Sequence, residues 1–544
     1  MRLVEALRSP LNGKLSYYIS MAIILVLAVF PLFFDYPYRI NIFLTWEGAY
    51  RMYLGQVPFK DFGLPLGYGF WLIPLLAFKL FGPYLFSLIK AQVFINIISG
   101  LGFLSILRSL KVKPGIQLAS VMVYCISFSF FNFWPWYNHT VIAFQIVGMA
   151  FLLKFMFAEI AWKKYTWLML STCFLFLSLF TKQDGGGLAL LVALALVAYH
   201  TYITKRYLDA GLFIGAYIFW ALVFILPVYG TEFKYWFNYG QAPHYSRINF
   251  FDILQETMNA SRWEKFYLLM VILLVLPKLK DIKNWIKERH EVVFFLLVLG
   301  IIVEALIFQV TSYTPPDNNI FFHSFAIPFI LTFIPWKMDL NRTGIFIITA
   351  SLILLWWSGT YWKYVDRIIK RVFPQEVLTA DNSDRTIISK NTYVKNTSDS
   401  TLIDMSEWTY TKLKAFEHIY MPAPTVEGIE RMMNLDIVQN KTDLKVLNMS
   451  ELTPLAHEMS YELETNKPLW YHLGVGIFEE QVQEYVNEIE QKKYDLVMFE
   501  TIPYLYDFYP EEVRNALKKE YVLKDRFLAP RRPTDSYIEV YVRP

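Results

Sequence analysis

Three carboxylates and three cations share one polar stretch between two long apolar runs of the sequence. They are Asp35, Glu47, Asp61, Arg39, Arg51 and Lys60. A carboxylate can accept the proton of an attacking hydroxyl, and arginine or lysine can stabilise a departing phosphate. The stretch therefore has the residue types for group transfer from a phosphate ester. The same residues would also be expected in a solvated loop, with Glu47 stabilising the start of a helix.

The elements that must position these residues are apolar. Of 544 residues, 55% are hydrophobic and 18% charged, and the mean hydropathy is +0.33. This composition excludes a soluble enzyme, a disordered chain and a disulfide-stapled domain, and a net charge of +4 does not point to nucleic acid. Apolar runs of about 17–25 residues recur up to about residue 362, and runs of this length can cross a hydrocarbon layer about 30 Å thick. We predict crossings at 15–34, 86–107, 114–133, 139–158, 165–181, 185–204, 209–229, 264–277, 291–311, 319–336 and 343–361. In the weakest, 264–277, we expect the charges of Glu264 and Lys265 to snorkel to the surface.

The segment 66–82 decides the topology, because it is apolar but short and contains Gly67, Gly69, Pro74 and Lys79. If it does not cross, basic residues crowd the loops of one side, whereas the short loops opposite hold Lys182 alone. The positive-inside rule then makes the basic side cytoplasmic. We therefore expect 66–82 to be an interfacial helix on the outer face. The first crossing is expected to be retained, with a cytoplasmic N-terminus.

The sequence after residue 362 has the composition of a soluble protein. We predict a transmembrane catalytic domain over 1–362, with a first outer loop at 35–85, a linker over 363–401 and an extracytoplasmic α/β domain over 402–544. Strands are predicted at 445–449, 494–500 and 537–542, and helices at 479–493 and 510–521. That domain contains no phosphate-binding glycine motif and no metal-spaced cysteine and histidine set. Cys125 and Cys173 both lie in apolar runs, so it has no disulfide.

The first loop carries a family resemblance. The segment WEGAYRMYLGQVPFKDFGLPLGYGFWLIPLLAFKLFG, residues 46–82, resembles the first external loop of GT-C integral-membrane glycosyltransferases, of the protein O-mannosyltransferase and lipid A aminoarabinose transferase type. The segment LFTKQDGGG at 179–187 is also similar to this family. The resemblance covers the loop closely and the topology loosely. The expected fold is therefore an α-helical polytopic membrane protein of about eleven crossings, with a C-terminal α/β domain.

The resemblance implies inverting transfer of a sugar from a polyprenyl-phosphate carrier to an acceptor hydroxyl on the outer face. The acceptor could belong to a protein, a glycolipid or a glycan. The family usually has an Asp-Glu pair after the first crossing, but this chain has Trp46-Glu47. The general base would then be Glu47, Asp61 or Asp35, and we favour Glu47, followed by Asp61. A divalent cation is possible, since some relatives use one and others do not.

Other polar residues fall at the same predicted depth. The candidates for binding the donor phosphate are Arg51, Lys60, Lys182 and Arg247. Further candidates for an outer-face cavity are Asp35, His139, Asp184, Glu304, Asp317 and His323. For each of these a structural role is an open alternative, such as an ion pair between helices or a cap. The aromatic loop 230–263 could close over a sugar or could belong to the interfacial aromatic belt.

Three other functions compete with this interpretation. A polysaccharide polymerase or ligase of the cell envelope is a close variant. A transporter or flippase should show broken helices and repeat symmetry near the midplane, and the sequence has neither. A non-catalytic scaffold leaves the charged first loop unexplained. In each case the chain is expected to be a multi-pass protein of the cell membrane in contact with membrane lipids, with no nucleic-acid partner.

Overall fold

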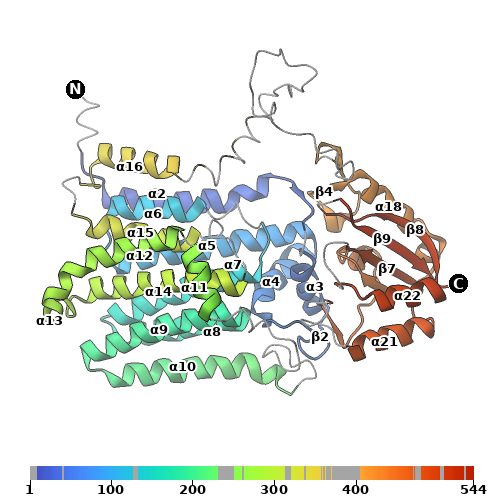
Figure 1. The fold of residues 1–544 in the computed structure, drawn as a ribbon, viewed down its shortest axis with the longest axis horizontal. Coiled ribbons are helices and arrows are strands. Elements are labelled where there is room, and N and C mark those ends of the chain that lie inside the picture. The colour runs from blue at the N-terminus through green and yellow to red at the C-terminus, as the bar shows by residue number, and fades with distance from the viewer. Residues whose placement is uncertain are drawn as a thin grey trace, which may run out of the picture.

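The structure is a computed structural model that divides into a helical bundle and an α/β domain at one end of it (Figure 1). We call this the junction end of the bundle. The residues described are 9–39, 42–126, 133–230, 250–259, 262–312, 320–335, 339–356, 405–469, 479–502, 508–531 and 534–544, with isolated positions at 358, 362, 365, 369, 403 and 471. Most of the predicted linker, 363–401, lies outside the described residues.

The bundle consists of apolar helices whose axes lie alongside one another (Figure 1). They are α2 (Gly13–Val29), α5 (Leu85–Ser109), α6 (Pro114–Ile126), α7 (Tyr137–Phe157), α8 (Ala161–Thr181), α9 (Gln183–Thr204), α10 (Tyr207–Ile225), α12 (Arg262–Val275), α14 (Arg289–Ser312), α15 (Ile320–Phe333) and α16 (Thr343–Trp356). Within the described residues, seven helical spans are long and apolar enough to cross a membrane. The chain is thus a multi-pass membrane protein. The helices α6, α12, α15 and α16 run beside these spans but are shorter, so eleven crossings remain a prediction.

Short elements connect the bundle helices. They are the 3-10 helices η3 (Leu226–Val228) and η6 (Leu276–Asp281) and the helices α11 (Phe250–Asn259) and α13 (Ile282–Trp285). At the start of α12, the expectation that Glu264 snorkels was wrong, because its side chain is fully buried. Lys265 does reach outward and donates to the carbonyl of Met258 at 2.8 Å. Buried Glu264 lies near Tyr267, so the helix turns this carboxylate into the bundle.

The first loop lies across the junction end. It contains η1 (Phe30–Phe33), β1 (Tyr36–Pro37), α3 (Ile42–Tyr53), β2 (Phe62–Gly63), η2 (Tyr68–Trp71) and α4 (Leu72–Phe81). Helix α3 begins at Ile42, before Glu47, the residue expected to stabilise the start of a helix. Two buried indoles hold it in place, because Trp46 donates to the carbonyl of Pro83 and Trp71 to that of Leu44, each at 3.0 Å.

The segment 66–82 does not traverse the bundle. Before it, Tyr36 pairs with Ile419 of the C-terminal domain. After it, the ring of Phe86 in α5 lies 4.3 Å from the ring of His418, in the same domain. The chain therefore re-enters the bundle from the end at which it left, as expected if η2 and α4 lie along the surface.

The C-terminal domain is built on a four-stranded sheet. Its strand order is β5 (Val446–Met449), β7 (Leu496–Thr501), β9 (Tyr537–Val542) and β8 (Val522–Leu528), with β5 and β7 parallel and the other pairs antiparallel. The helices are α18 (Ala423–Met433), α19 (Asp436–Asn440), α20 (Leu455–Glu458), α21 (Glu479–Glu490) and α22 (Glu511–Glu520), with 3-10 turns η9 (Met405–Glu407) and η10 (Lys414–Phe416). The three predicted strands and two predicted helices are all present, within a few residues of their expected bounds.

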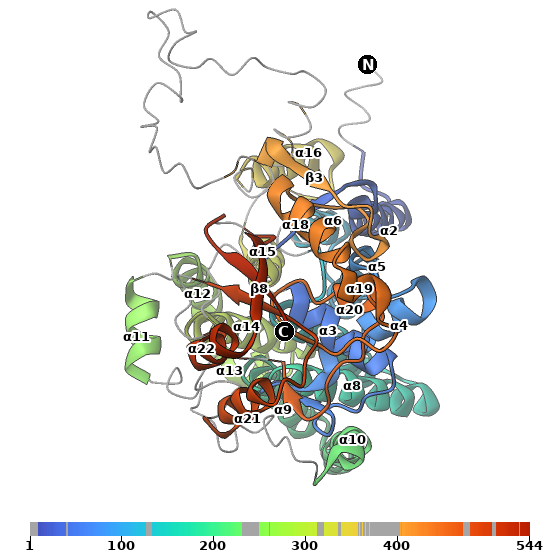
Figure 2. The same ribbon diagram turned by 90° about the vertical axis from the view of Figure 1, so that its right-hand side faces the viewer.

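Two small sheets join the first loop to the C-terminal domain. Strand β1 pairs in parallel with β4 (Ile419–Pro422), which also pairs with β3 (Trp408–Tyr410). Strand β2 pairs in parallel with β6 (Lys467–Pro468). The loop and the domain also share one hydrophobic core, in which the ring of Phe43 meets that of Phe508 at 6.4 Å. Viewed along the bundle, the C-terminal domain covers α3 and the ends of the central helices (Figure 2).

Candidate functional site

Glu47 and Arg51 form a buried ion pair on one face of α3. They are four residues apart, so they lie on adjacent turns, and Arg51 Nη2 is 2.8 Å from Glu47 Oε1. The guanidinium also donates to the side chain of Gln56 at 3.0 Å and to the backbone carbonyl of Glu464 at 2.6 Å. Arg51 therefore connects Glu47 to the C-terminal domain through an ion pair on one side and hydrogen bonds on the other.

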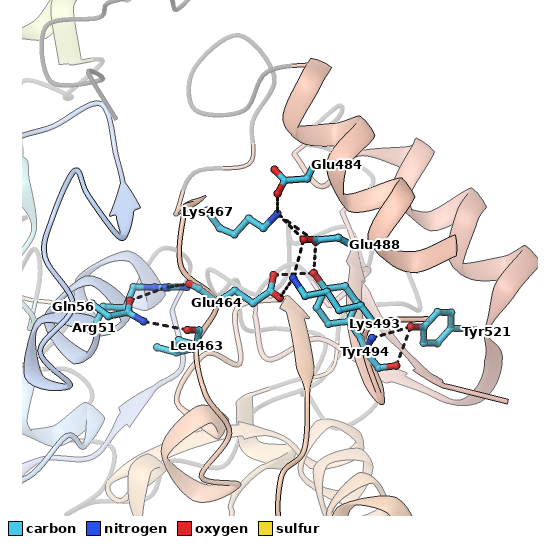
Figure 3. A network of polar contacts seen from close by, with 10 residues as sticks. All are labelled: Arg51, Gln56, Leu463, Glu464, Lys467, Glu484, Glu488, Lys493, Tyr494 and Tyr521. Atoms are coloured by element: carbon cyan, nitrogen blue, oxygen red, sulfur yellow. Dashed lines mark hydrogen bonds and ion pairs between the residues drawn. The ribbon is translucent and has the colours of Figure 1, made fainter. Parts of the chain in front are cut away.

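A polar network extends from this pair into the C-terminal domain (Figure 3). Glu464 forms an ion pair with Lys493 at 2.6 Å and accepts a hydrogen bond from the Tyr494 hydroxyl at 2.8 Å. Burial tends to raise the pKa of Glu488, but hydrogen bonds from Lys493 and Tyr494 outweigh it and lower that pKa. Lys467 completes the network by pairing with Glu488 at 3.3 Å. These contacts hold Glu488 in its ionised form.

A small cavity of about 30 Å³ lies between α3 and the C-terminal domain. Its polar lining residues are Glu47, Arg51, Asn448, Thr453, Tyr461, Glu464, Lys467, Tyr471 and Tyr485. The buried hydroxyl of Thr453 has no hydrogen-bond partner among the described residues, and Tyr471 and Tyr485 share a hydrogen bond. A polar cavity of this size has room for one or two water molecules.

The other charged residues of the first loop face elsewhere. Asp61 accepts a hydrogen bond from the backbone N–H of Val57 at 2.7 Å, which closes the turn between α3 and β2. Lys60, beside it, is exposed. Asp35 binds His418 Nδ1 at 2.7 Å and the hydroxyl of Tyr410 at 2.9 Å. Glu47 and Arg51 line the cavity, and Asp61, Lys60 and Asp35 do not.

A second cluster lies inside the bundle, at the turn between α8 and α9. Lys182 Nζ is 3.0 Å from Asp184 Oδ2, and both side chains are largely buried. In α14, Glu304 is 2% exposed and accepts a hydrogen bond from Gln145 of α7 at 2.5 Å. Glu304 and Asp184 are close enough to interact electrostatically. The structure therefore brings three of the predicted outer-face residues together on neighbouring helices.

This bundle cluster lies directly beneath the first loop. A Cβ atom built on Gly69 of η2 would lie 2.7 Å from Thr181 Oγ1, next to Lys182. The ring of Tyr137, in the first turn of α7, is 5.7 Å from Lys182 Nζ and 6.0 Å from the ring of Phe70. Because Gly69 has no side chain, η2 can approach the end of α8 closely. The cluster therefore lies at the junction end.

The remaining predicted residues are dispersed. His139 lies in the first turn of α7, and its backbone N–H donates to the carbonyl of Trp136. His323 of α15 is fully buried and its Nδ1 lies 3.0 Å from the Tyr267 hydroxyl. Arg247, Asp317 and most of the aromatic loop 230–263 lie outside the described residues.

Beside His323, an apolar groove of about 400 Å³ runs between α12, α15 and α16. Trp263 and Tyr267 of α12 line it, together with aliphatic residues of α15 and α16. Thr349 is a polar residue within this lining. The groove thus offers hydrocarbon contacts along most of its length.

A buried triad in the C-terminal domain was not predicted from the sequence. Arg531 Nη2 lies 3.0 Å from Glu451 and 2.7 Å from Glu500, and all three side chains are at most 1% exposed. Tyr38 of the first loop donates its hydroxyl to the carbonyl of Glu451. Glu451 follows β5 and Glu500 lies in β7, so the carboxyl edge of the parallel strand pair faces the bundle. Two acids at the ends of predicted neighbouring strands were the available signal.

In the described residues, no group of three or more histidine, cysteine, aspartate or glutamate side chains is arranged to hold a metal ion. The possible divalent cation therefore remains an expectation from the sequence resemblance.

Comparisons with known proteins give two similar solved structures. No family model matches the chain, and no curated protein does. One similar structure is ArnT from Cupriavidus metallidurans bound to undecaprenyl phosphate, with 14% identity and a TM-score of 0.36 over 65% of this chain. The match spans 62% of that protein, less than two thirds of its length. The other is ArnT from the same organism in the apo state, with 11% identity and a TM-score of 0.46, over 96% of this chain and 97% of that one.

Proposed function

We propose that this chain is an integral-membrane glycosyltransferase that moves a sugar from a polyprenyl-phosphate carrier to an acceptor hydroxyl. The observation that supports it most is the buried cluster of Lys182, Asp184 and Glu304 beneath the first loop. Ionisable side chains are costly within an apolar bundle, and there they are functional-site candidates by default. The resemblance of the first loop to GT-C enzymes supplies the reaction class.

In the proposed reaction, the acceptor oxygen attacks the anomeric carbon as the bond from that carbon to the carrier phosphate breaks. A carboxylate of the first loop takes the acceptor proton, and the carrier leaves as its anionic phosphate. A single displacement of this kind inverts the anomeric centre. It needs a base and cations at the junction end, and no nucleotide-binding site.

We assign the base to Glu47 first and to Asp61 second. A general base must lie within hydrogen-bond reach of the proton that it accepts, and Glu47 lines the cavity beside Arg51 whereas Asp61 does not. Arg51 and Lys182 are then the described cations for the carrier phosphate, since both lie at the junction end and are mostly buried, whereas Lys60 is exposed. Arg247 stays a sequence-based candidate for the same role.

The test uses the purified full chain in liposomes with radiolabelled polyprenyl-phosphate sugars. Substituting Glu47→Gln or Asp61→Asn removes the base with little change in shape. Loss of a positioned base lowers the rate about 100-fold to 10,000-fold. We expect a loss in this range for Glu47→Gln, while Glu462→Gln, at a carboxylate outside the cavity, should transfer at the wild-type rate.

Two outcomes would contradict different parts of the proposal. Wild-type rates in both the Glu47 and Asp61 variants would show that the base lies elsewhere. Absence of transfer by the wild-type chain from every polyprenyl-phosphate sugar tried would show that the enzyme class is wrong.

A further inference from the structure

The first turns of α5 contain a lysine, Lys90, that lies against two aromatic rings. Lys90 Nζ lies 4.5 Å from the ring centre of Phe81 and 5.5 Å from that of Phe86. Within the described part of the chain, Lys90 has these ring contacts but no ion pair. Its side chain is half-buried. A partly desolvated ammonium is unfavourable unless an anion accompanies it.

A segment of the C-terminal domain passes over the same helix start. Lys414 Nζ lies 4.8 Å from the ring centre of Tyr84, and the ring of His418 lies 4.3 Å from that of Phe86. Tyr84 raises the pKa of Lys414 most, and the carboxylates of Glu417 and Glu458 raise it further, so this ammonium is charged at physiological pH. Basic side chains from two domains therefore gather over three rings. We call Phe81, Tyr84, Phe86, Lys90, Lys414 and His418 the junction patch.

Three carboxylates lie close to the junction patch, and each already faces a donor. Asp35 accepts from His418 and from Tyr410. Glu458 accepts from the backbone N–H of Ala415. Glu417 Oε1 lies 3.8 Å from His418 Nε2. None of these contacts reaches Lys90, so its charge is not neutralised within the described residues.

The patch borders the surface that the bundle presents to lipid. Large apolar side chains around it are exposed, among them Phe33 at 78%, Leu80 at 66% and Leu76 at 51%. Rings and basic residues at the end of a membrane-spanning helix typically lie at the depth of the lipid headgroups. The anion available at that depth is a lipid phosphate.

We propose that the junction patch binds the phosphate of an anionic glycerophospholipid between Lys90 of the bundle and Lys414 of the C-terminal domain. Such a phosphate neutralises Lys90 and bridges the two domains. The docking of the C-terminal domain on the bundle then depends on the lipids around it. This inference does not depend on the proposed transferase activity.

The test compares the full chain in nanodiscs of phosphatidylcholine alone with nanodiscs that also contain phosphatidylglycerol. We measure the temperature of thermal unfolding and count bound phosphatidylglycerol by native mass spectrometry. Each lysine near anionic lipid is worth roughly fivefold in affinity. Phosphatidylglycerol should therefore raise the unfolding temperature of the wild type. A Lys90→Gln, Lys414→Gln variant should bind this lipid at least about tenfold less tightly, because it lacks two such charges.

Matched controls separate a specific site from general attraction to the membrane. A Lys79→Gln, Lys412→Gln variant loses two exposed lysines from the same region and should keep the effect of phosphatidylglycerol. A Lys90→Arg, Lys414→Arg variant keeps both charges, so phosphatidylglycerol should still raise its unfolding temperature. If the glutamine variant does not fold, the wild type must still retain phosphatidylglycerol in preference to phosphatidylcholine in the mass spectra.

Three results would overturn the proposal. One is an equal effect of phosphatidylglycerol on the wild type and on the folded Lys90→Gln, Lys414→Gln variant. Another is equal stabilisation by inorganic phosphate in phosphatidylcholine nanodiscs, which would make the ligand a free anion. The third is displacement of phosphatidylglycerol by polyprenyl phosphate at equal concentration, which would assign the patch to a carrier lipid.

Discussion

Arg531 is shared by two carboxylates in the interior of the C-terminal domain. Glu451 and Glu500 both contact its guanidinium, so a single positive charge faces two acids. Burial raises the pKa of the Glu500 carboxyl, and the nearby Arg531 offsets only part of that effect. The folded chain therefore favours the protonated form of Glu500 more than the unfolded chain does.

The pKa shift predicts how stability depends on pH. Below the unfolded glutamate pKa of about 4.3, the folded state keeps the full benefit of a protonated Glu500. That benefit is lost as pH rises through the raised folded pKa. Glu500→Gln removes this loss and should stabilise the full chain at pH 7, by a free energy of unfolding on the order of 1 kcal/mol. Guanidinium unfolding as a function of pH measures it.

Glu539 is a control, because its pKa is shifted in the opposite direction to that of Glu500. Burial raises its pKa, but the hydrogen bond from Arg514 outweighs burial and lowers it. Its contribution to stability is present above the unfolded pKa and is lost as pH falls through the folded pKa. Glu539→Gln should therefore destabilise the chain at pH 7 and have little effect in acid. Equal effects of the two substitutions at pH 7 would contradict this account of the triad.

Local spacing determines which site residues could be predicted. The interval of four residues between Glu47 and Arg51 places them on one face of a helix, and the structure pairs them. The contact between Asp35 and His418 joins positions 383 residues apart. No periodicity or motif connects such positions, because the contact forms only when two segments far apart in the sequence pack together. His418 was missed for this reason.

At the scale of elements, the α8–α9 turn positions the bundle cluster through its glycines. A Cβ atom on Gly186 would lie 2.2 Å from backbone atoms of Leu179, whereas a Cβ on Gly187 would meet nothing closer than 4.0 Å. The backbone of α8 cannot move aside as a flexible side chain would. The position of Lys182 and Asp184 therefore depends on Gly186.

Adjacent alanine substitutions test this dependence. Overpacking of this kind typically costs about 1–3 kcal/mol, so Gly186→Ala should lower stability by that amount and displace the Lys182–Asp184 pair. Gly187→Ala should be neutral or stabilise the helix by up to about 1 kcal/mol. Thermal unfolding in detergent measures the stability of both variants, and the transfer assay measures their activity. A Gly186→Ala protein as stable and active as Gly187→Ala would refute the argument.

Elements with a clear apolar pattern were predictable, and edge elements were not. Strands β5, β7 and β9 are mostly buried and appear as apolar runs. Strand β8 was missed because its first half is exposed and its middle is charged, and among the described strands only β9 pairs with it. Helix α3 extends beyond its predicted start because Trp71 and the C-terminal domain bury its first turn, which local sequence does not encode.

At the scale of the whole molecule, the bundle has two chemically different ends. The first loop and the C-terminal domain lie at one end, and α13 lies at the other (Figure 1). The sequence places basic residues such as Lys280 and Lys283 near α13. The positive-inside rule then predicts that the C-terminal domain is extracytoplasmic.

Cysteine labelling in intact cells tests this orientation. With Cys125 and Cys173 replaced, Glu479→Cys introduces an exposed thiol in the C-terminal domain, and Lys280→Cys introduces one at the opposite end. A membrane-impermeant maleimide should label the first directly and the second only after the cells are permeabilised. The reverse pattern would invert the topology and place the proposed transfer site in the cytoplasm.

The parallel pairs β1–β4 and β2–β6 have a consequence for how the protein can be divided. In each pair, a strand of the C-terminal half lies beside a strand of the N-terminal half. Backbone hydrogen bonds cross between the halves, from Tyr38 N–H to the carbonyl of Tyr420 and from Leu469 N–H to the carbonyl of Gly63. Expressed by itself, residues 402–544 would leave β4 and β6 open to any available strand, and unpaired edges favour self-association. Co-expressed fragments, by contrast, should reassemble and purify together.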